Sequence, residues 1–368
     1  MGRLAVALWI RWDKIRSVMK PRCAVAGVLV AVCLAIGPAV AAQALRIYFI
    51  DTEGGQSTLV VTPAGQSMLI DTGFPGDGKF SSKPGDPSQA RDANRIAAAA
   101  RDAGVSRINV LVVSHAHADH IGGVTELAAL MPIDTFVDNG GPLPNADAVA
   151  GTLDAFKWYE AVRAKGKHIV AKPGDRVPLK GADVTVVSAA GRTISAPLPG
   201  AGEANPECTA ATPPQEPTEN PRSVAVVLQL GQFRYLDPGD LTGEPLFALT
   251  CPKNLIGHVD VYRVAHHGGA DAADPAMFDA LRPNAAIIIN GPMKGGAPNL
   301  LVELRKHADI DTWQLHHSLL PGAQDVDADR IANVDTTTSH WLLLTANPDG
   351  TFAITNPRTG ATKSYARR

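Results

Sequence analysis

Residues 108–123 read INVLVVSHAHADHIGG, an apolar run that leads directly into three histidines and an aspartate. The run INVLVV predicts a buried β-strand. His115 and His117 are two residues apart, so in an extended segment both side chains project to one side. Asp119 and His120 follow where the chain bends into a helix. Imidazole and carboxylate together suit zinc, iron or manganese, so this stretch predicts a metal site at the end of a strand.

Three further polar positions follow predicted strands, and one loop cannot fill two coordination spheres alone. Asp71 ends the strand SMLID, Asp240 follows FRYLD in the turn DPGD, and His266-His267 follow an apolar strand in VYRVAHHGG. Strand ends are where sheet proteins place functional groups, so these residues are candidate ligands. Each also fits a structural role: Asp71 as a turn cap, Asp240 as a helix N-cap, and the histidine pair as a polar turn.

The rest of the chain alternates between short strands and helices. Turn signals separate strands predicted at 45–51, 57–62, 67–71, 108–113, 135–138, 183–188, 223–230, 232–237, 259–264, 285–289, 341–345 and 351–355. Helical patterns fall at 89–103, 124–130, 146–165, 274–282 and 298–307, and a loop at 74–88. Meanders mixed with helices favour an α/β sandwich with mixed sheets over a doubly wound parallel sheet.

The N-terminal stretch, residues 1–42, has the pattern of a secretory signal peptide. Lys20 and Arg22 precede an apolar run from 24 to 42, which Gly37-Pro38 interrupts and which ends in an A-x-A cleavage pattern. Met19 competes with Met1 as the start. We therefore expect a domain over 43–368 that is periplasmic or secreted and has no stable membrane anchor after cleavage. An uncleaved anchor is the alternative.

Removal of residues 1–42 would leave two cysteines, Cys208 and Cys251. In an oxidising compartment such a pair can form one disulfide; two unpaired thiols are the alternative. Cys208 lies in segment 190–222, which holds seven prolines and little regular signal, so we expect an exposed loop or insertion there that a disulfide would tie to the domain.

The formal net charge of −2 hides an asymmetry. Residues 1–42 contain six Lys or Arg and one Asp, a charge of +5, so the remainder carries −7. Because nucleic-acid binding requires a basic face, this acidic domain argues against a nucleic-acid partner. A small-molecule or cell-envelope substrate is the expectation that remains.

Four motifs together resemble the metallo-β-lactamase superfamily: LIDTG at 69–73, HAHADHIGG at 115–123, PGDL at 238–241 and AHHGG at 265–269. The chain is most similar in look to the branch that includes the hydrolase domain of bacterial DNA-uptake channel proteins and choline-phosphate esterases. The resemblance covers about residues 45–320. It implies an α/β fold of four layers, an αββα sandwich, with two divalent metal ions at one edge, usually Zn²⁺.

The resemblance also implies a role for each candidate residue. The first ion would be held by His115, His117 and His266, and the second by Asp119 and His120.

Three more roles follow from the same resemblance. Asp240 would bridge the two ions, and Asp71 would orient a ligand histidine from behind. His267 would donate a proton or bind substrate, or replace His266 as the ligand.

One stretch departs from that branch, which often has a late Gly-His-Pro that gives a histidine to the second ion. Here the comparable residues, 291–298, read GPMKGGAP and contain no histidine, so a weaker or more open second site is expected. His316 or His317 is a possible replacement, and Lys294 is the cation placed to meet an anionic substrate. Structural roles are expected for the histidines without a motif, His168, His258, His307 and His340.

The function that these patterns favour is a secreted dinuclear hydrolase with a hydroxide shared between its two ions. Asp119 or His267 would pass a proton to the leaving group. A phosphate ester or phosphodiester is the preferred substrate, because the resembled branch acts on such bonds. The alternatives are an acyl substrate such as a lactone or thioester, and a non-catalytic metal-binding surface module. Redox chemistry at a di-iron centre is a further alternative, although these 368 residues contain no counterpart of the flavin domain that such enzymes use.

Overall fold

The structure is a computed structural model that describes residues 44–76, 89–208, 212–213 and 216–367. These residues belong to one compact unit, Ala42–Arg368. The expected signal peptide at 1–42 lies outside the described residues, and so does most of the expected loop at 74–88. Among the described residues, no helix combines the length and apolar character needed to cross a membrane.

Two mixed β-sheets form the centre of this unit. The first has nine strands in the order β17-β16-β15-β1-β2-β3-β4-β5-β6. Its strands from β3 to β6 are parallel and its other pairs are antiparallel. The strands are β1 Leu45–Phe49, β2 Thr58–Val61, β3 Ser67–Ile70, β4 Ile108–Val112, β5 Ile133–Asp138, β6 Lys167–Val170, β15 Leu342–Ala346, β16 Phe352–Asn356 and β17 Ala361–Tyr365.

The second sheet has eight strands in the order β14-β13-β12-β11-β10-β9-β7-β8. It is parallel from β10 to β14 and antiparallel from β10 to β8. Each sheet therefore has one parallel half. The strands are β7 Asp183–Ala189, β8 Arg192–Thr193, β9 Ala225–Leu230, β10 Phe233–Asp237, β11 Val261–Arg263, β12 Ala285–Ile288, β13 Asp311–His316 and β14 Ile331–Asn333.

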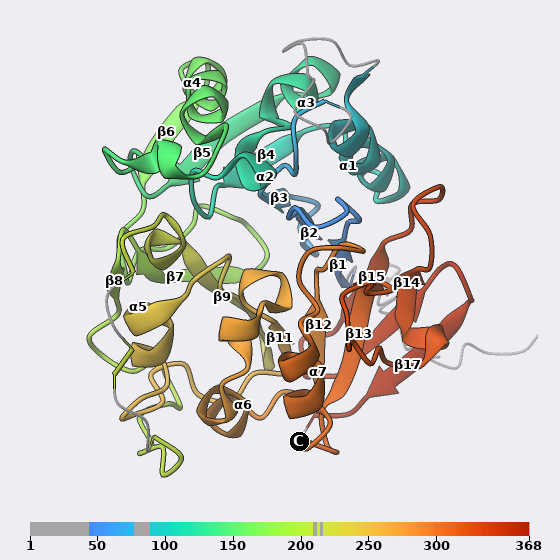
Figure 1. Cartoon of the computed structure of the whole chain (residues 1–368). Helices are drawn as coiled ribbons and strands as arrows, with labels where there is room; N and C mark the ends of the chain where they lie inside the picture. The colour runs from blue at the N-terminus through green and yellow to red at the C-terminus, as the bar shows by residue number, and fades with distance from the viewer. Residues whose placement is uncertain (1–43, 77–88, 209–211, 214–215, 368) are drawn as a thin grey trace, which may run out of the picture. The chain divides into compact units, whose positions relative to one another are not determined.

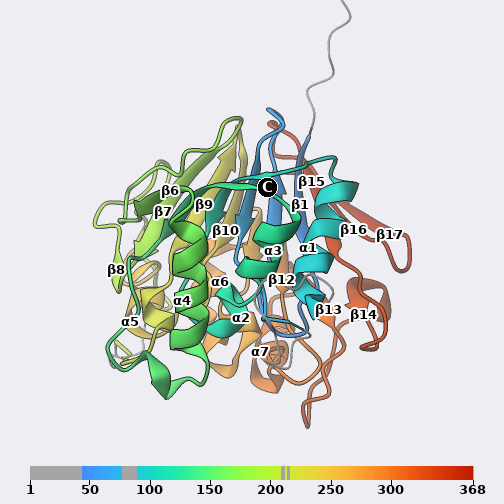
Figure 2. The same ribbon diagram turned by 90° about the horizontal axis from the view of Figure 1, so that it is seen from above.

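Helices cover the outer face of each sheet. Figures 1 and 2 show α1, α3 and α4 beside one another on the first sheet, with α5, α6 and α7 on the second. The α-helices are α1 Arg91–Asp102, α2 Ala118–Ile121, α3 Val124–Leu130, α4 Thr152–Arg163, α5 Gly243–Ala248, α6 Pro275–Leu281 and α7 Pro298–Leu304. Short 3-10 turns are η2 Ala146–Ala148, η3 Asn220–Arg222, η4 His266–Gly268, η5 Ala270–Ala272 and η6 Ala328–Arg330.

Alternation along the strands explains the layering, because successive side chains of a strand point to opposite faces. In β1, Leu45, Ile47 and Phe49 enter the apolar core between the two sheets, whereas Tyr48 enters the core beneath α1 and α3. A third core lies between the second sheet and its helices. The expected four-layer αββα sandwich is confirmed.

Several elements differ from the sequence-based expectation. The helix expected at 146–165 is interrupted: α4 begins at Thr152, after Gly151 at φ +82°, a conformation that glycine adopts without a Cβ clash. The edge strands β6, β8, β14 and β17 were not predicted. β17, sequence ATKSY, is largely exposed and polar, so it lacks the apolar run that identifies buried strands.

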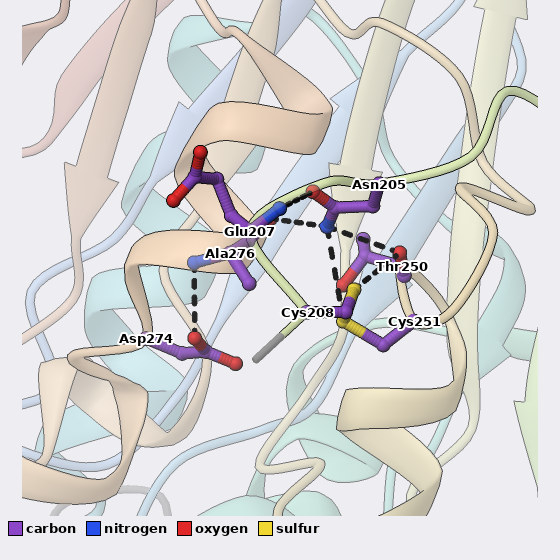
Figure 3. Close-up of a disulfide and its surroundings, with 7 residues drawn as sticks. All are labelled: Asn205, Glu207, Cys208, Thr250, Cys251, Asp274 and Ala276. Carbon is purple, nitrogen blue, oxygen red and sulfur yellow. Dashed lines mark hydrogen bonds between the residues drawn. A yellow bond between two sulfur atoms is a disulfide. The ribbon is translucent and has the colours of Figure 1, made fainter. Parts of the chain in front are cut away.

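The described residues of the proline-rich segment 190–222 have little regular structure, but they are not simply exposed. Glu219 and Asn220 are buried, as is Ile194 at its start. Cys208 forms a disulfide with Cys251 across 43 residues of sequence. Figure 3 shows Asn205 beside the disulfide, where its side-chain amide donates to the carbonyls of Thr250 (3.1 Å) and Ala276 (2.9 Å). These contacts fasten the segment to the start of α6.

Candidate metal centre

The candidate ligands meet where the parallel halves of both sheets end. In the first sheet β3 and β4 are parallel, so Asp71 and the stretch 114–120 leave them at the same edge. In the second sheet β10 and β11 are parallel, and Asp240 and His267 follow them. The parallel pairing of these strands therefore brings residues far apart in sequence to one site.

Gly239 allows the two sheets to approach at this edge. It has φ +60°, and a Cβ at this position would lie 2.7 Å from Cβ of Ser114. Only glycine fits both the backbone conformation and the contact. Asp240, which follows β10 of the second sheet, therefore lies against the 114–120 stretch of the first sheet.

His266 and His267 occupy the left-handed backbone region, with φ of 49° and 54°. For non-glycine residues this conformation costs on the order of 1–3 kcal/mol each and persists where the surroundings hold it. Here the amides of Gly296 and Ala297 donate to the carbonyls of His267 (3.0 Å) and Gly268 (2.9 Å). The strained turn directs the side chain of His267 inward.

Four buried side chains form the centre: Asp119, His120, Asp240 and His267 offer ligand atoms that all lie within 4.8 Å of one another. Oδ2 of Asp240 lies 3.0 Å from Nε2 of His120 and 3.0 Å from Nε2 of His267. Oδ2 of Asp119 lies 3.2 Å and 3.3 Å from the same two nitrogens. We call these four residues the ligand cluster.

His115 and His117 form a second pair beside the ligand cluster. Nε2 of His115 lies 2.8 Å from Nδ1 of His117, and the rings of His115 and His120 are 4.1 Å apart between centroids. His115 is fully buried and His117 is 8% exposed. Two ring nitrogens that face one another at this distance suit two ligands of one ion.

Asp71 supports the ligand cluster from behind. One oxygen, Oδ1, accepts from the amide of Ser114 (2.7 Å); the other, Oδ2, accepts from Oγ of Ser114 (2.6 Å) and from Nδ1 of His120 (2.7 Å). Because Nδ1 of His120 is occupied, Nε2 faces Asp119 and Asp240. Asp71 thus contacts a candidate ligand histidine from outside the ligand cluster.

Negative charge dominates the ligand cluster. Burial works to raise the pKa of Asp119, but the Lys294 ammonium and His120 outweigh burial and hold the pKa well below its ordinary value. Burial works to lower the pKa of His120, but Asp240, Asp119 and Asp71 outweigh burial and raise it well above 6.5. Without an ion these carboxylates hold a proton on His120, a place that a divalent cation would take.

His115, His117 and His267 have lowered pKa values, so these three imidazoles are neutral and suited to coordination. Burial lowers the pKa of His115 well below 6.5 and that of His117 to about 4. Burial also lowers the pKa of His267, whose Nδ1 faces the carbonyl of Ile289 at 3.2 Å. Since Nδ1 of His267 donates to that carbonyl, Nε2 presents a lone pair to the ligand cluster.

Sequence analysis favoured His266 as a metal ligand and His267 as a proton donor or substrate contact, and the structure reverses these positions. His267, not His266, joins the ligand cluster. The side chain of His266 is 29% exposed, its Nε2 lies 4.0 Å from Oδ2 of Asp240, and its Nδ1 lies 2.8 Å from Asp271. His267 replaces His266 as the ligand candidate, and His266 takes the rim position.

Lys294 reaches the ligand cluster from the loop between β12 and α7. Its ammonium donates to Oδ2 of Asp119 and lies 3.2 Å from Nε2 of His267. It is also 5.9 Å from the centroid of the Phe74 ring. The Lys294 side chain is 41% exposed, so it connects the buried carboxylate with solvent.

The histidines proposed as replacements lie elsewhere. Nε2 of His316 is 2.9 Å from Asp51, whose other oxygen is bound by Arg95 at 3.0 Å. His317 pairs with Asp325 and is half-exposed. Neither belongs to the ligand cluster.

Three residues at the site were missed from the sequence. Ser114 precedes the histidine stretch, and Arg263 is a fully buried cation 3.7 Å from Oδ1 of Asp240. A charged residue inside the apolar strand VYRV was a signal for a buried partner. The buried Asn220 places its amide 3.3 Å from Nε2 of His266, and nothing in its proline-rich surroundings indicated this contact.

The ligand cluster fits a divalent ion. Bonds of about 2.0–2.2 Å to nitrogen and oxygen place neighbouring ligand atoms roughly 3 Å apart, as found here. Oδ1 of Asp240 is buried and has no hydrogen-bond partner among the described residues, which leaves a free acceptor at the site. The mixed imidazole and carboxylate donor set suits zinc, iron or manganese.

Comparison with protein families adds to this geometry. Residues 51–204 match the sequence model of the metallo-β-lactamase superfamily. This range, less than half of the chain, is similar to that superfamily. The matched range includes Asp71 and the 114–120 stretch, and metallo-β-lactamase-type chains typically bind two metal ions. The branch of the superfamily that the sequence resembles stays a prediction. A comparison with curated protein sequences found no match.

Several solved structures are similar to this metallo-β-lactamase fold. CmlA, a diiron β-hydroxylase from Streptomyces venezuelae, is 12% identical with a TM-score of 0.44, and the match covers 74% of this chain and 53% of CmlA, about half of its length. YhfI from Bacillus subtilis, a metallo-β-lactamase fold protein, is 11% identical with a TM-score of 0.42, covering 74% and 96%. A diphosphatase from the PhnP family is 13% identical with a TM-score of 0.38, covering 73% and 94%.

Proposed function

We propose that this protein is a metal-dependent hydrolase that cleaves a phosphate ester or phosphodiester. The observation that carries the proposal is the ligand cluster, whose four buried ligand atoms from both sheets lie within 4.8 Å of one another. An ion held there supplies a Lewis acid that activates water near neutral pH and stabilises the charge that develops on a phosphoryl oxygen.

The protein's own residues orient the ligands. Asp71 accepts the Nδ1 proton of His120 (2.7 Å), and the carbonyl of Ile289 accepts that of His267 (3.2 Å). Both histidines therefore present Nε2 to the ion without rotating. Such outer partners fix the tautomer and ring orientation of ligand histidines.

The rim of the site supports an anionic substrate. The partly exposed Lys294 ammonium lies beside Asp119, and His266, 4.0 Å from Asp240, contacts Asn220. Cations and N–H donors beside a metal ion are the groups that bind phosphoryl oxygens. We assign substrate contact to Lys294 and His266.

The test is hydrolysis by metal-loaded protein of bis(p-nitrophenyl) phosphate, p-nitrophenyl phosphate and p-nitrophenyl acetate. We expect turnover of a phosphate ester that EDTA abolishes and that falls at least about 100-fold in Asp240→Asn. The matched control is His258→Ala, since His258 is exposed and lies outside the ligand cluster.

Two results would contradict the proposal. Hydrolysis of the acetate alone would assign the site to acyl substrates such as lactones or thioesters. Bound metal without turnover of any of the three compounds would assign the protein to metal-binding surface modules.

We further propose that the protein acts in the periplasm or outside the cell on a small-molecule or cell-envelope substrate. The Cys208–Cys251 disulfide supports this location, because structural disulfides persist in oxidising compartments. Fractionation of cells that express the full chain with a C-terminal tag is the test. We expect the tag in the periplasm or medium, on a chain that starts near residue 43; a full-length cytoplasmic product would contradict it.

A further inference from the structure

Lys294 is built into the metal centre. Its Cβ packs against the backbone of Gly54, where an added Cβ would come within 2.9 Å of it. Gly54 has φ +101°, so glycine is required there for the conformation as well as for the contact. The ammonium ends between Asp119 and His267, both members of the ligand cluster. The side chain is thus placed at its Cβ and at its ammonium, which brings a positive charge to the centre.

The Lys294 ammonium donates hydrogen bonds to atoms of Asp119 and His267 whose lone pairs an ion at this site would also use. Oδ2 of Asp119 has two lone pairs and can bind an ion and the ammonium together. Nε2 of His267 has one lone pair, which an ion would take from Lys294. Lys294 would then remain bound to Asp119 while an ion occupies the ligand cluster.

Charge balance at this edge favours one ion. Six buried or partly buried charged side chains contact the ligands or one another: Asp71, Asp119, Asp237, Asp240, Arg263 and Lys294. With neutral histidines these four carboxylates and two cations leave a charge of −2, which one divalent ion neutralises. A second ion would leave +2, and uncompensated charge is costly among side chains that are mostly buried.

We propose that the Lys294 ammonium takes the place of a second divalent ion, so that the centre binds one ion per chain. The inference rests on the proposed function, because it requires the ligand cluster to bind a metal. It predicts a departure from the two ions that the superfamily typically binds. His115 and His117, which have no carboxylate partner of their own in the ligand cluster, would accept a second ion only when the lysine charge is removed.

The experiment measures metal per chain by mass spectrometry after loading the full-length protein with Zn²⁺ or Mn²⁺ and removing free ion. We expect one equivalent in the natural protein and in Lys294→Arg, which keeps the charge. We expect two equivalents in Lys294→Met, which has similar length and no charge, with the second ion bound at least tenfold more tightly than in the natural protein. Lys306→Met, at an exposed lysine paired with Glu303, is the matched control and should bind one.

A second measurement reports the distance between ions. Electron paramagnetic resonance of the Mn²⁺-loaded protein should show an isolated ion in the natural chain and a spin-coupled pair in Lys294→Met. Two equivalents in the natural chain would overturn the inference and leave the proposed function intact. One equivalent in Lys294→Met would also overturn it, since the lysine would then not be what excludes the second ion. No bound metal in the natural chain would refute the proposed function itself.

Discussion

Oδ2 of Asp71, at the end of β3, lies 2.7 Å from Nδ1 of His120, 49 residues later in the chain. This contact directs Nε2 of His120 toward Asp119 and Asp240. Both side chains are fully buried, so water does not compete for the hydrogen bond. The position of a metal ligand therefore depends on a carboxylate that does not itself belong to the ligand cluster.

Asp71→Asn should weaken metal binding roughly 10–100-fold, the usual loss when the outer partner of a ligand histidine is removed. The amide oxygen can replace only one of the two carboxylate acceptors that Ser114 and His120 use. Competition with a chromophoric chelator measures the affinity. Asp134→Asn, at a half-exposed aspartate on β5, is the control and should leave affinity unchanged. Equal metal affinities in Asp71→Asn and Asp134→Asn would show that Asp71 does not contribute to metal binding.

The adjacent histidines should respond differently to truncation. His267→Ala removes a ligand atom and should lower metal affinity by more than the roughly 100-fold upper range for an outer partner. His266→Ala should retain the ion, because His266 lies outside the ligand cluster. Metal content and chelator competition distinguish the two variants. Loss of the ion in His266→Ala with retention in His267→Ala would restore the assignment that the sequence favoured.

Asp92 should make stability depend on pH. Burial raises its pKa to about 6, despite contacts with Arg91 and the Phe74 amide. The folded state thus holds this proton more tightly than the unfolded state, so the stabilising contribution is present below about pH 4 and lost as pH rises through 6. The lost contribution is about 3 kcal/mol.

The measurement is urea unfolding of the natural protein and Asp92→Asn between pH 4 and 7. The unfolding free energy of the variant minus that of the natural protein should rise with pH over this interval. A difference that is constant with pH, or that falls, would contradict a raised pKa.

The Cys208–Cys251 disulfide should stabilise the domain through its effect on the unfolded chain. It closes a loop with a sequence separation of 43 residues, for which loop entropy predicts about 4 kcal/mol. Cys208→Ser with Cys251→Ser should lower the unfolding free energy by an amount of this order. Metal content of the folded variant should persist, because neither cysteine belongs to the ligand cluster. Unchanged stability in the double variant would show that the disulfide does not constrain the unfolded chain.

Much of the fold was accessible from the sequence because its central strands are short apolar runs between turn residues. β1 to β4 and β9 to β12 lie within one or two residues of the predicted bounds. The edge of the site was predictable for the same reason, since Asp71, His115 and Asp240 each come directly after such a run.

What the sequence could not decide depends on contacts between distant segments. His266 and His267 follow the same strand, and the amide of Gly296, bonded to the His267 carbonyl, holds the turn that sends His267 inward. Lys294 and Asp119 meet across 175 residues of sequence. Asn220 reaches the rim from a segment whose composition indicated only a loop. Such pairings have no local pattern.

The division of the ligands between the two sheets has a consequence for assembly. Asp119 and His120 come from the first sheet and Asp240 and His267 from the second, so neither half of the sandwich can coordinate the ion alone. An ion that binds there would be captured only after the two halves have docked, and it would then resist their separation. The fraction of chains that hold a bound metal ion would therefore report how many chains have the two halves correctly docked.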